Sequence, residues 1–381
     1  MVPVSTSPDI AVVGGGIAGA SVAHELAATR SVVLLEAEPE PGMHSTARSA
    51  ATWIPGHGVA TVRALITASG PRFARLADEL DAPALLAPRA VLLVATDDDG
   101  EAALARHLAE RAGEPDVAVP LDPDEARRRC PALRDVRAAA VVETAADVDV
   151  DALHRAYLRG LRARGGTVRT RAHVVALHRD GGGWAVRLAD GTVLHAGEVV
   201  DAAGAWADVV ADAAGVPRIG LTPLRRTIAV ARVPDPARLA APDGRLLPMV
   251  CEAADRWYFK ADGTNLLVSP ADETPAVPGD ARPDELDVAL ALERVEEVTG
   301  LGLRSVVTSW AGLRSFVPDR RPVVGAWPDH PGFWFVAAQG GSGIETAPAL
   351  SALAAAVITG GTPDVPVDPA DLAPTRLLSM T

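Results

Sequence analysis

The stretch that decides the fold runs from Asp9 to Ala27 and reads "DIAVVGGGIAGASVAHELA". It joins a short apolar run to a glycine turn and then to apolar residues at helical spacing. The next apolar run, "SVVLLEAE" at 31–38, ends in acidic residues. These patterns predict a strand, a helix and a second strand, which together make one βαβ unit. The sequence therefore predicts an α/β fold that begins with a Rossmann-like unit.

The glycines of this turn predict a dinucleotide site. Gly14, Gly16 and Gly19 form the pattern GxGxxG, and Glu36 ends the second predicted strand. The first glycine permits a tight turn, the second lets the backbone approach a pyrophosphate, and the third lets helix and strand pack closely. The carboxylate then receives ribose hydroxyls, while the helix N-terminus faces the phosphate charge. We expect a bound dinucleotide, and the alternative is a glycine-rich turn with no ligand.

The sequence that follows distinguishes a flavin dinucleotide from a nicotinamide dinucleotide. Between Thr167 and Asp201 the sequence predicts three strands with glycine-rich turns, and "VVDAAGAWAD" follows at 199–208. A nicotinamide enzyme of this length would continue with more βα units, so a flavin dinucleotide is favoured. A nicotinamide-dependent dehydrogenase and a non-catalytic flavoprotein that binds a partner through its sheet domain stay as alternatives.

Composition excludes several classes of function. The chain has 381 residues, 48% of them hydrophobic, which predicts two domains. A net charge of -13 argues against a nucleic acid partner, because phosphates need a cationic face. Cys130 and Cys251 lie far apart without metal-ligand spacing, so we expect no metal site and a reducing, cytoplasmic location. No apolar run reaches the roughly 20 residues of a membrane span, so no integral membrane segment is expected.

The predicted layout alternates two domains along the chain. Helical patterns occur at 68–80, 101–113, 151–166, 284–300 and 347–360, and strand-like text returns between Leu221 and Pro270. We expect a Rossmann-like nucleotide-binding domain built from residues 1–87, 146–215 and 305–381. A second, mainly antiparallel α+β domain, built from 88–145 and 216–304, is expected to hold the substrate.

Several stretches together resemble one known superfamily. They are "GMHSTARSAA" (42–51), "DVDVDALHRAYLRG" (147–160), "VVDAAGAWAD" (199–208), "LTPLRR" (221–226), "WAGLRSFVPD" (310–319) and "VAAQGGSGIET" (336–346). With the glycine motif they resemble the FAD-dependent amino-acid oxidoreductases of the D-amino-acid oxidase, glycine oxidase and sarcosine oxidase superfamily, and D-arginine dehydrogenase most among its members. The likeness covers nearly the whole chain. It implies noncovalent FAD, because neither cysteine matches a flavin linkage site.

The resemblance implies which residues hold the cofactor. One segment matches the lining of the pyrophosphate and isoalloxazine, Val174 matches a backbone contact to adenine, and a glycine loop before the last helix faces the flavin. The expected FAD residues are Gly14, Gly16, Ile17, Ala18, Gly19, Glu36, Ala37, Ser45, Thr46, Arg48, Ser49, Ala50, Ala51, Thr52, Val174, Ala203, Gly204, Gly340, Gly343 and Ile344.

Two arginines are candidates for holding the substrate. Arg314 lies among apolar residues, and a guanidinium in such company is either paired structurally or waiting for an anionic ligand. The resemblance matches Arg314 to the arginine that holds a substrate carboxylate and Arg226 to its partner, although Arg226 could equally be a surface charge. Tyr258 matches a tyrosine that reaches the substrate, and its alternative is a core tyrosine. Gly341 belongs to the loop beside the flavin and completes the catalytic candidates.

Departures from the resemblance affect the substrate pocket, for which Trp53, His57, Val91 and Glu345 are the candidates. Val91 stands where D-arginine dehydrogenase has a glutamate for a cationic side chain, which favours a more apolar or compact substrate. Thr52 and His57 replace a histidine and a tyrosine of a lid. Glu345 replaces a glutamine, and its carboxylate either attracts an amine or faces solvent.

The expected reaction is the FAD-dependent oxidative deamination of a D-amino acid by hydride transfer from Cα to flavin N5. The imino acid then gives a 2-oxo acid and ammonia, and a separate electron acceptor, not specified by the sequence, completes the cycle. Leu267 stands where sarcosine oxidases place an oxygen-activating lysine, and Lys260 is expected to be a solvated surface lysine. This favours a dehydrogenase over an oxidase. The alternative substrate is a secondary amine, namely an N-methyl or cyclic imino acid.

Overall fold

The predicted βαβ unit is confirmed. The structure is a computed structural model that describes residues 7–114, 116–241, 244 and 246–379. Strand β1 (Ile10–Val13), helix α1 (Ile17–Leu26) and strand β2 (Val32–Leu35) follow in the predicted order, and β1 pairs with β2 in parallel. All four residues of β1 are buried, as expected for a parallel strand that is covered on both faces.

The main sheet collects strands from three distant parts of the chain. Its order is β20-β21-β13-β1-β2-β9, and all its strands pair in parallel except β20, which runs antiparallel at one edge. The strands added to β1 and β2 are β9 (Thr167–Arg169), β13 (Glu198–Asp201), β20 (Val323–Gly325) and β21 (Phe333–Ala337). The glycine turn after β1 therefore lies at the carboxyl edge of the sheet, where ligands of open α/β folds bind.

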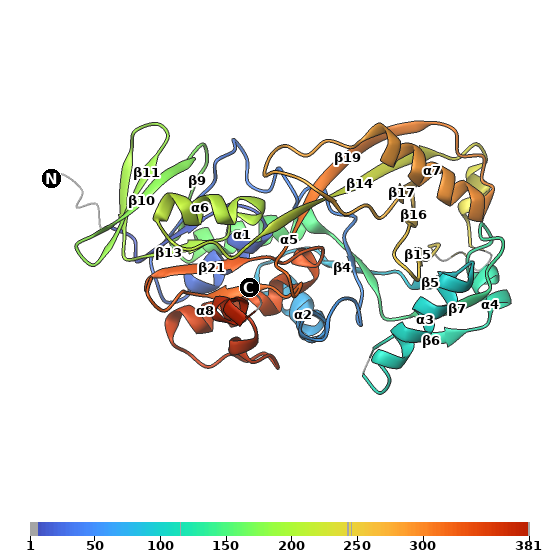
Figure 1. Cartoon of the computed structure of the whole chain (residues 1–381), viewed down its shortest axis with the longest axis horizontal. Helices are drawn as coiled ribbons and strands as arrows, with labels where there is room; N and C mark the ends of the chain where they lie inside the picture. Colours follow the sequence, from blue (N-terminus) through green and yellow to red (C-terminus); the bar gives the residue numbers. More distant parts are fainter. Residues whose placement is uncertain (1–6, 115, 242–243, 245, 380–381) are drawn as a thin grey trace.

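Helices cover one face of this sheet and a small sheet covers the other (Figure 1). The helices that share the first core with β1 are α1, α2 (Ala60–Glu79), α5 (Val150–Ala163) and α8 (Gly343–Thr359). Helix α6 (Ala207–Ala214) and the sheet of β10 (Val174–Asp180), β11 (Gly183–Leu188) and β12 (Val193–Ala196) pack in the other core. The three strands predicted across 167–201 are present as β10–β12, but the bounds were too wide, because β9 and β13 flank this small sheet and join the main one.

The second part of the molecule is built on a large, mostly antiparallel sheet. Helices α4 (Pro123–Arg129) and α7 (Glu285–Thr299) pack against one face, and α3 (Asp98–Glu110) lies on the other. The strands, in sheet order, are β18 (Thr274–Pro275), β14 (Thr222–Arg232), β17 (Asn265–Ser269), β16 (Tyr258–Asp262), β15 (Met249–Glu252), β5 (Val91–Ala95), β7 (Ala138–Val142) and β6 (Val119–Leu121), with β19 (Val306–Phe316) paired to β14. The predicted α/β class with a second, antiparallel-sheet part is confirmed.

Strands β14 and β19 link the two parts, and Figure 1 shows them running side by side from one to the other. Their antiparallel register pairs Leu224 with Arg314 and Arg226 with Gly312. The predicted layout assigned β19 to the third nucleotide-binding segment from residue 305, but its pairing with β14 makes it a strand of the large sheet. Both ends of the predicted layout, residues 1–6 and 380–381, lie outside the described residues.

Small elements complete the fold. A second small sheet pairs β3 (Thr52–Trp53) and β4 (Leu86–Pro88) with β8 (Ala146–Val148). The 3-10 turns are η1 (Gly204–Trp206), η2 (Pro236–Leu239), η3 (Pro369–Asp371) and η4 (Pro374–Ser379). Over the residues that the structure describes, helices that combine the length and apolar character needed to cross a bilayer are absent.

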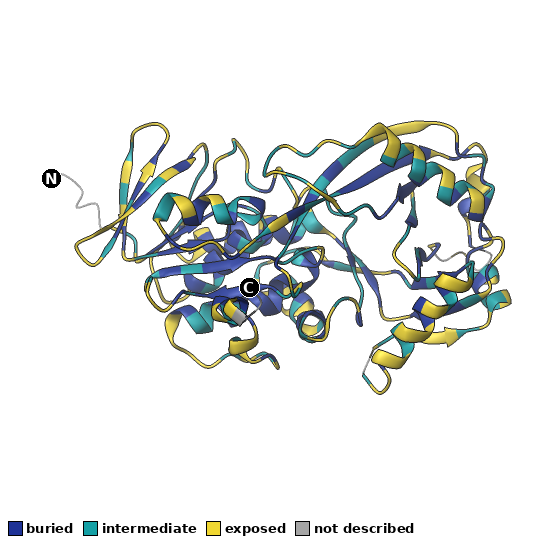
Figure 2. Ribbon diagram, viewed as in Figure 1, coloured by how far each residue is buried: buried dark blue, intermediate teal, exposed yellow. Residues whose placement is uncertain are grey.

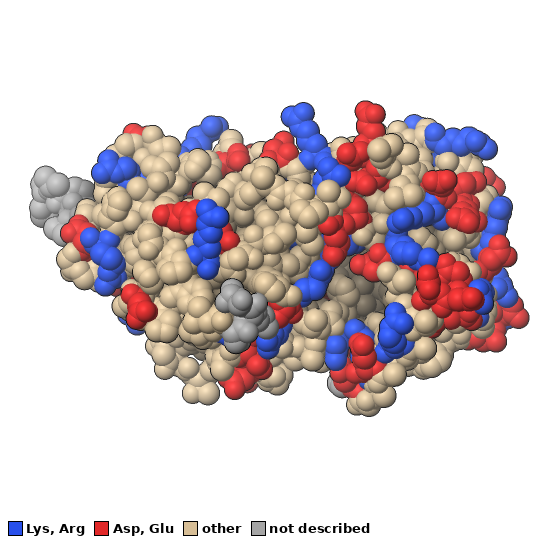
Figure 3. All heavy atoms as spheres, viewed as in Figure 1, with Lys and Arg blue, Asp and Glu red and all other residues tan. Residues whose placement is uncertain are grey.

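Burial and charge differ between the two parts. In Figure 2 the main sheet is buried, whereas the outer faces of α3, α4 and α7 are exposed. In Figure 3 the charged side chains gather over the part built on the large sheet, and the other part is mostly uncharged on the same face. The exposed charges on this face therefore lie mainly over the second part.

Candidate functional site

One large cavity of about 900 Å³ runs from the glycine turn to the large sheet. That volume is near the upper end of the roughly 300–1,000 Å³ common for small-molecule sites. The cavity brings together most of the predicted site residues, although they come from segments spread across the whole chain. Those that line it are Gly14, Gly16, Ile17, Ala18, Glu36, Ala37, Ser45, Thr46, Arg48, Ser49, Ala50, Ala51, Thr52, His57, Val174, Ala203, Gly204, Arg226, Tyr258, Arg314, Gly340, Gly341, Gly343, Ile344 and Glu345.

The glycine turn is shaped by contacts that leave no room for side chains. Gly14 has a φ of +105°, and a Cβ on it would lie 2.5 Å from the carbonyl oxygen of Ala202. A Cβ on Gly19 would lie 1.8 Å from the carbonyl oxygen of Gly14. Gly19 therefore does not line the cavity, and it acts by packing α1 closely against the turn. The backbone is thereby left bare toward the cavity.

Two helix N-termini meet at the cavity. Helix α1 begins at Ile17 and α8 begins at Gly343, and neither has a side-chain hydrogen bond at its N-cap in the described structure. Both first turns line the cavity, so their positive dipole ends point toward its contents. Such an arrangement suits an anionic pyrophosphate at α1 and a negatively charged ring edge at α8.

The segment from 42 to 51 is tied to both neighbours. Thr46 Oγ1 accepts a hydrogen bond from the Ile17 amide at 2.9 Å, and Ser45 Oγ donates to the Leu313 carbonyl at 2.7 Å. Arg48 donates to the carbonyl oxygens of Ala281 and Ala311 at 2.8 and 3.0 Å. The Arg48 guanidinium is thus engaged by protein groups, and it fastens the segment to the large sheet.

Glu36 and His154 hold the glycine turn from two sides. Glu36 is 9% exposed, and its Oε2 accepts the Gly15 amide at 2.7 Å. His154 on α5 lies with Nε2 2.8 Å from the Gly15 carbonyl oxygen, and burial lowers the pKa of this histidine. We therefore infer that a neutral imidazole donates this bond. The sequence reasoning missed His154, although it stands inside a quoted segment, because its partner is 139 positions away.

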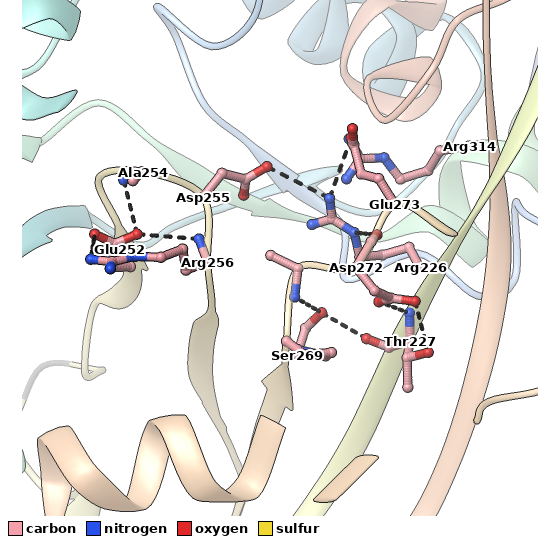
Figure 4. A network of polar contacts seen from close by, with 12 residues as sticks. Arg226, Thr227, Glu252, Ala254, Asp255, Arg256, Ser269, Asp272, Glu273 and Arg314 are labelled. Atoms are coloured by element: carbon pink, nitrogen blue, oxygen red, sulfur yellow. Dashed lines mark hydrogen bonds and ion pairs between the residues drawn. The ribbon is translucent and has the colours of Figure 1, made fainter. Parts of the chain in front are cut away.

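Two arginines point into the other half of the cavity (Figure 4). Arg226 on β14 and Arg314 on β19 lie on the same face of the sheet. Arg226 pairs with Gly312, and Arg314 is two residues from Gly312 on the same strand, so both side chains point to the same side. Arg226 is 6% exposed, and its Nε donates to the Asp272 carbonyl at 2.9 Å. Asp255 and Glu273 each have a carboxylate oxygen 3.6 Å from its Nη2.

Arg314 is both paired and open. Its Nη2 donates to Glu273 at 2.9 Å, and Glu273 also accepts from Arg320 at 2.7 Å. Among the described residues, Arg314 Nε and Arg226 Nη2 have no hydrogen-bond acceptor within reach. Burial, together with the charge of Arg226, lowers the pKa of Arg314 to about 10, so it stays charged at neutral pH. Both guanidinium groups line the cavity, where an anionic ligand would pair with them.

Gly341 and Tyr258 border the arginine pair. A Cβ on Gly341 would lie 2.8 Å from Arg314 Nε, so only glycine lets this loop approach the guanidinium. Tyr258 lines the cavity from β16, and Arg226 lies over its ring at 5.9 Å. Burial raises the pKa of Tyr258, which keeps the phenol protonated and able to donate a hydrogen bond.

Glu345 does not face solvent. Its residue is 5% exposed, and Oε1 accepts the Ile54 amide at 2.8 Å. His57 Nδ1 lies 3.4 Å from Glu345 Oε2, so two departures from the resembled pattern contact each other. Both residues line the cavity, as predicted.

The structure corrects two of the predicted pocket residues. Trp53 donates from Nε1 to the Ile66 carbonyl at 2.9 Å and packs into the first core, away from the cavity. Val91 is 0% exposed and pairs with Val142 and Met249, so it lies beneath the cavity wall. Leu93, on the same strand face, is the residue of β5 that reaches the cavity.

Comparison with known proteins agrees with this geometry. The family model described as FAD dependent oxidoreductase matches residues 9–357. The chain belongs to this family. FAD is therefore the dinucleotide, and the nicotinamide alternative is dropped. The glycine turn without room for side chains, the start of α1 at the cavity and the buried Glu36 fit this cofactor.

Individual relatives extend the comparison. A glycine oxidase from Pseudomonas putida is 31% identical over 191 residues, which are 50% of this chain and 48% of the relative, so the chain spans about half the length of that curated protein. The structure of L-proline dehydrogenase from P. horikoshii superposes with a TM-score of 0.85 at 21% identity over 98% of both chains. Iminodiacetate oxidase from Chelativorans sp. BNC1 superposes at 0.78 with 25% identity, over 96% of this chain and 98% of its own.

The structure also corrects the expectation for Lys260. Its side chain is 13% exposed, and Nζ donates to the Ala50 carbonyl at 2.6 Å and to Asp147 at 2.9 Å. Lys260 is thus a half-buried, paired cation that contacts the cavity residue Ala50, and its register partner on β17 is Leu267. Its ammonium is engaged by protein groups, and Leu267 is buried beside it.

The two cysteines differ in position. Cys130 is fully buried in the core of the large sheet, and Cys251 lines the cavity. Burial is the main cause that raises the pKa of the Cys251 thiol, so it is not a ready nucleophile. Noncovalent attachment of the flavin stays a prediction.

Sequence reasoning missed three charged residues of the arginine site, namely Asp255, Glu273 and Arg320. Arg320 directly follows the stretch 310–319 that contains Arg314, Asp255 lies three positions before Tyr258, and all three line the cavity or contact the arginines that do. The available signal was a charged residue in the loop after an apolar strand. The partners themselves, however, are brought together only by the folding of β14 against β19.

Proposed function

We propose that this protein oxidises an α-amino acid at the carbon that bears the amine, with FAD as the hydride acceptor. The observation that carries the proposal is the arginine pair, buried Arg226 and half-buried Arg314, which lines the same cavity as the FAD motif. A planar carboxylate matches a guanidinium fork, and burying it there would satisfy both partners. The names of the relatives, which act on glycine, proline and iminodiacetate, support the same class of substrate.

Each residue of the site has a part in this proposal. Arg226 and Arg314 bind the carboxylate and orient the Cα hydrogen, and Tyr258 donates to the same ligand. Gly341 keeps the loop before α8 against Arg314. FAD, when bound, accepts the hydride that leaves Cα. Positioning supplies most of the rate under this mechanism, so no side chain is needed to remove the Cα hydrogen.

Within this class we propose a D-amino acid as the substrate and a dehydrogenase as the activity. The resemblance to D-arginine dehydrogenase supports the stereochemistry. The absence of a lysine at Leu267 and the engagement of Lys260 by Ala50 and Asp147 support an acceptor other than oxygen. With Val91 beneath the cavity wall and Leu93 in it, the side chain of the substrate is expected to be apolar or compact.

A secondary amine, such as proline or an N-methyl amino acid, is the second candidate. The observation that favours it is the pair of structural relatives named for proline and iminodiacetate, both of which carry a secondary amine. The same arginine pair would hold their carboxylates.

The test is an anaerobic titration of the purified, FAD-bound protein. D-amino acids, their L enantiomers, sarcosine and proline are added one at a time while the flavin absorbance is followed. Bleaching by D enantiomers only, with slow recovery in air, is the expected result. Bleaching by secondary amines alone selects the second candidate, and a flavin that none of these compounds reduces contradicts the proposed function.

A further inference from the structure

A buried carboxylate in the cavity contacts one imidazole. Glu345 lies in the first turn of α8, 5% exposed, and its Oε1 is fixed by the Ile54 amide at 2.8 Å. Its Oε2 faces His57 Nδ1 at 3.4 Å, whereas half of the His57 side chain is exposed (50%). The arginine site already described does not use this pair. The pair therefore joins a fixed carboxylate to an accessible imidazole that lines the cavity.

The surroundings of His57 favour its proton. Burial lowers the pKa of His57, but the hydrogen bond to Glu345 and the charges of Glu345 and Asp255 outweigh burial and the opposing charge of Arg314, so the pKa is raised. The neighbouring His107 behaves oppositely, because burial and the charge of Arg111 lower its pKa to about 4. His107 is therefore neutral near pH 7 and does not compete for the proton.

The loop that carries His57 is held in place. Arg111 donates from Nε to the Gly56 carbonyl at 2.7 Å, and Arg63 donates to the Gly58 carbonyl at 3.0 Å. Arg63 is in turn paired with Glu114. Charged donors fix the carbonyls on both sides of His57, so the backbone holds the imidazole beside Glu345.

We propose that the Glu345–His57 pair accepts the proton that an ammonium substrate must lose before oxidation and delivers it to water through His57. The inference rests on the proposed function. An aliphatic amine is mostly protonated in neutral water, and hydride leaves readily only from a carbon next to a neutral amine. One N–H bond of the ammonium breaks, one N–H bond forms on the imidazole, and the amine nitrogen keeps its electron pair, so the step needs no further reactant.

Besides its position, the charge of the pair in each protonation state suits it to accept a proton from an ammonium group. When His57 is neutral, the pair carries one negative charge, which attracts an ammonium group in the cavity that the arginines also line. When His57 holds the proton, the pair is neutral and no longer favours the cationic form. The cavity thus offers cations to the carboxylate of an α-amino acid and this anionic pair to its amine.

The test compares pH profiles of kcat/KM for the FAD-bound wild type, Glu345→Gln and His57→Gln, with a substrate found by the anaerobic titration. In the wild type kcat/KM rises as His57 loses its proton and then levels off. Without this proton acceptor, the variants can oxidise only the fraction of substrate whose amine is already neutral in solution. Their kcat/KM is expected to be about 100-fold lower near pH 7 and to approach the wild type as the pH nears the pKa of the substrate amine.

His195→Gln is the matched control, because His195 also pairs with a carboxylate, Asp180 at 3.1 Å, but on the small sheet of β10–β12. Its profile is expected to match the wild type. A second measurement, the NMR titration of the ring signal that disappears in His57→Gln, reports on the pair without catalysis. Its pKa is expected to fall in Glu345→Gln.

The outcomes separate the two claims. Profiles of Glu345→Gln and His57→Gln that parallel the wild type at every pH would overturn the proton-acceptor role, and so would an unchanged His57 titration in Glu345→Gln. Because His57 is half exposed, His57→Gln is a safe second variant if Glu345→Gln does not fold. A wild type that oxidises no amino acid or amine would instead contradict the proposed function.

Discussion

The two halves of the cavity are built in different ways. The FAD half is made mainly by backbone, with the turn at Gly14, the packing of Gly19 and the starts of α1 and α8. The half that contains Arg226 and Arg314 is made by charged side chains, and the pairing of β14 with β19 brings the two arginines together. A site of backbone depends on local sequence and tolerates almost no added atoms. A site of side chains depends on the tertiary fold, and single residues can change its chemistry without changing the fold.

The largest effect is expected from Gly19→Ala. The new Cβ would meet the Gly14 carbonyl oxygen at 1.8 Å, and neither backbone segment can move without disturbing the core of the main sheet. We expect a loss of about 3 kcal/mol or more in the free energy of unfolding, together with loss of bound flavin. Thermal unfolding and the flavin-to-protein absorbance ratio measure both effects.

Gly279→Ala is the matched control for this substitution, because the nearest atom to a Cβ there, a backbone oxygen, is 3.9 Å away. Its stability and flavin content are expected to match the wild type. If Gly19→Ala keeps its flavin and its stability, the account of a tightly packed backbone site is wrong.

A smaller but functional effect is expected from Arg314→Lys. Lysine keeps the charge but lacks the planar fork and Nε, which has no acceptor among the described residues and faces Gly341. We expect kcat/KM to fall about 100-fold, mostly through KM, with the flavin still bound. Steady-state kinetics and the flavin spectrum separate these two outcomes.

Arg225→Lys provides the comparison for Arg314→Lys. Arg225 is the neighbour of Arg226 in sequence, but its side chain pairs with Asp287 at 2.7 Å on the α7 side of β14. We expect a change in KM below about twofold, because this pair lies outside the cavity. An equal rise of KM in Arg225→Lys and Arg314→Lys would show that the position of Arg314 at the cavity does not matter for substrate binding.

Among the variants at the arginine site itself, the smaller effect is expected from Glu273→Gln. Glu273 pairs with Arg314 at 2.9 Å and with Arg320 at 2.7 Å, so it competes with any carboxylate that approaches the arginines. Removing its charge is expected to tighten the binding of a carboxylate ligand that cannot be oxidised, such as benzoate, about 3- to 5-fold. Titration by flavin absorbance measures the dissociation constant. Weaker binding would mean that Glu273 supports the arginines instead of competing with the ligand.

The same contrast explains what the sequence could predict. The βαβ unit, the glycine turn and Glu36 follow from local spacing, and the structure places them as expected because backbone geometry is set by neighbouring residues. The sequence predicted that Arg314 is either paired with the protein or free to bind a ligand. In the structure it pairs with Glu273 and also lines the cavity. Its partner Glu273 is 41 positions away and could not be identified by spacing.

The wrong predictions share one physical cause, which is tertiary burial. Lys260 was expected in solvent, but Asp147 and the Ala50 carbonyl, both far along the chain, give its ammonium a buried partner. Val91 was placed in the pocket by matching positions, whereas the next residue on the same strand face, Leu93, reaches the cavity. Strand pairing decides whether a residue of a strand lies at the cavity surface or beneath it, and local sequence does not show this.

The most direct test of the central claim, that Arg226 and Arg314 hold a substrate carboxylate beside FAD, is an anaerobic comparison of one amino acid with its own amide. The rate of flavin bleaching is measured for the substrate selected by the titration and for the corresponding amide, in wild-type protein. The account predicts that the acid reduces the flavin about 100-fold faster, because only the carboxylate satisfies the arginine donors. Equal rates for acid and amide would contradict it.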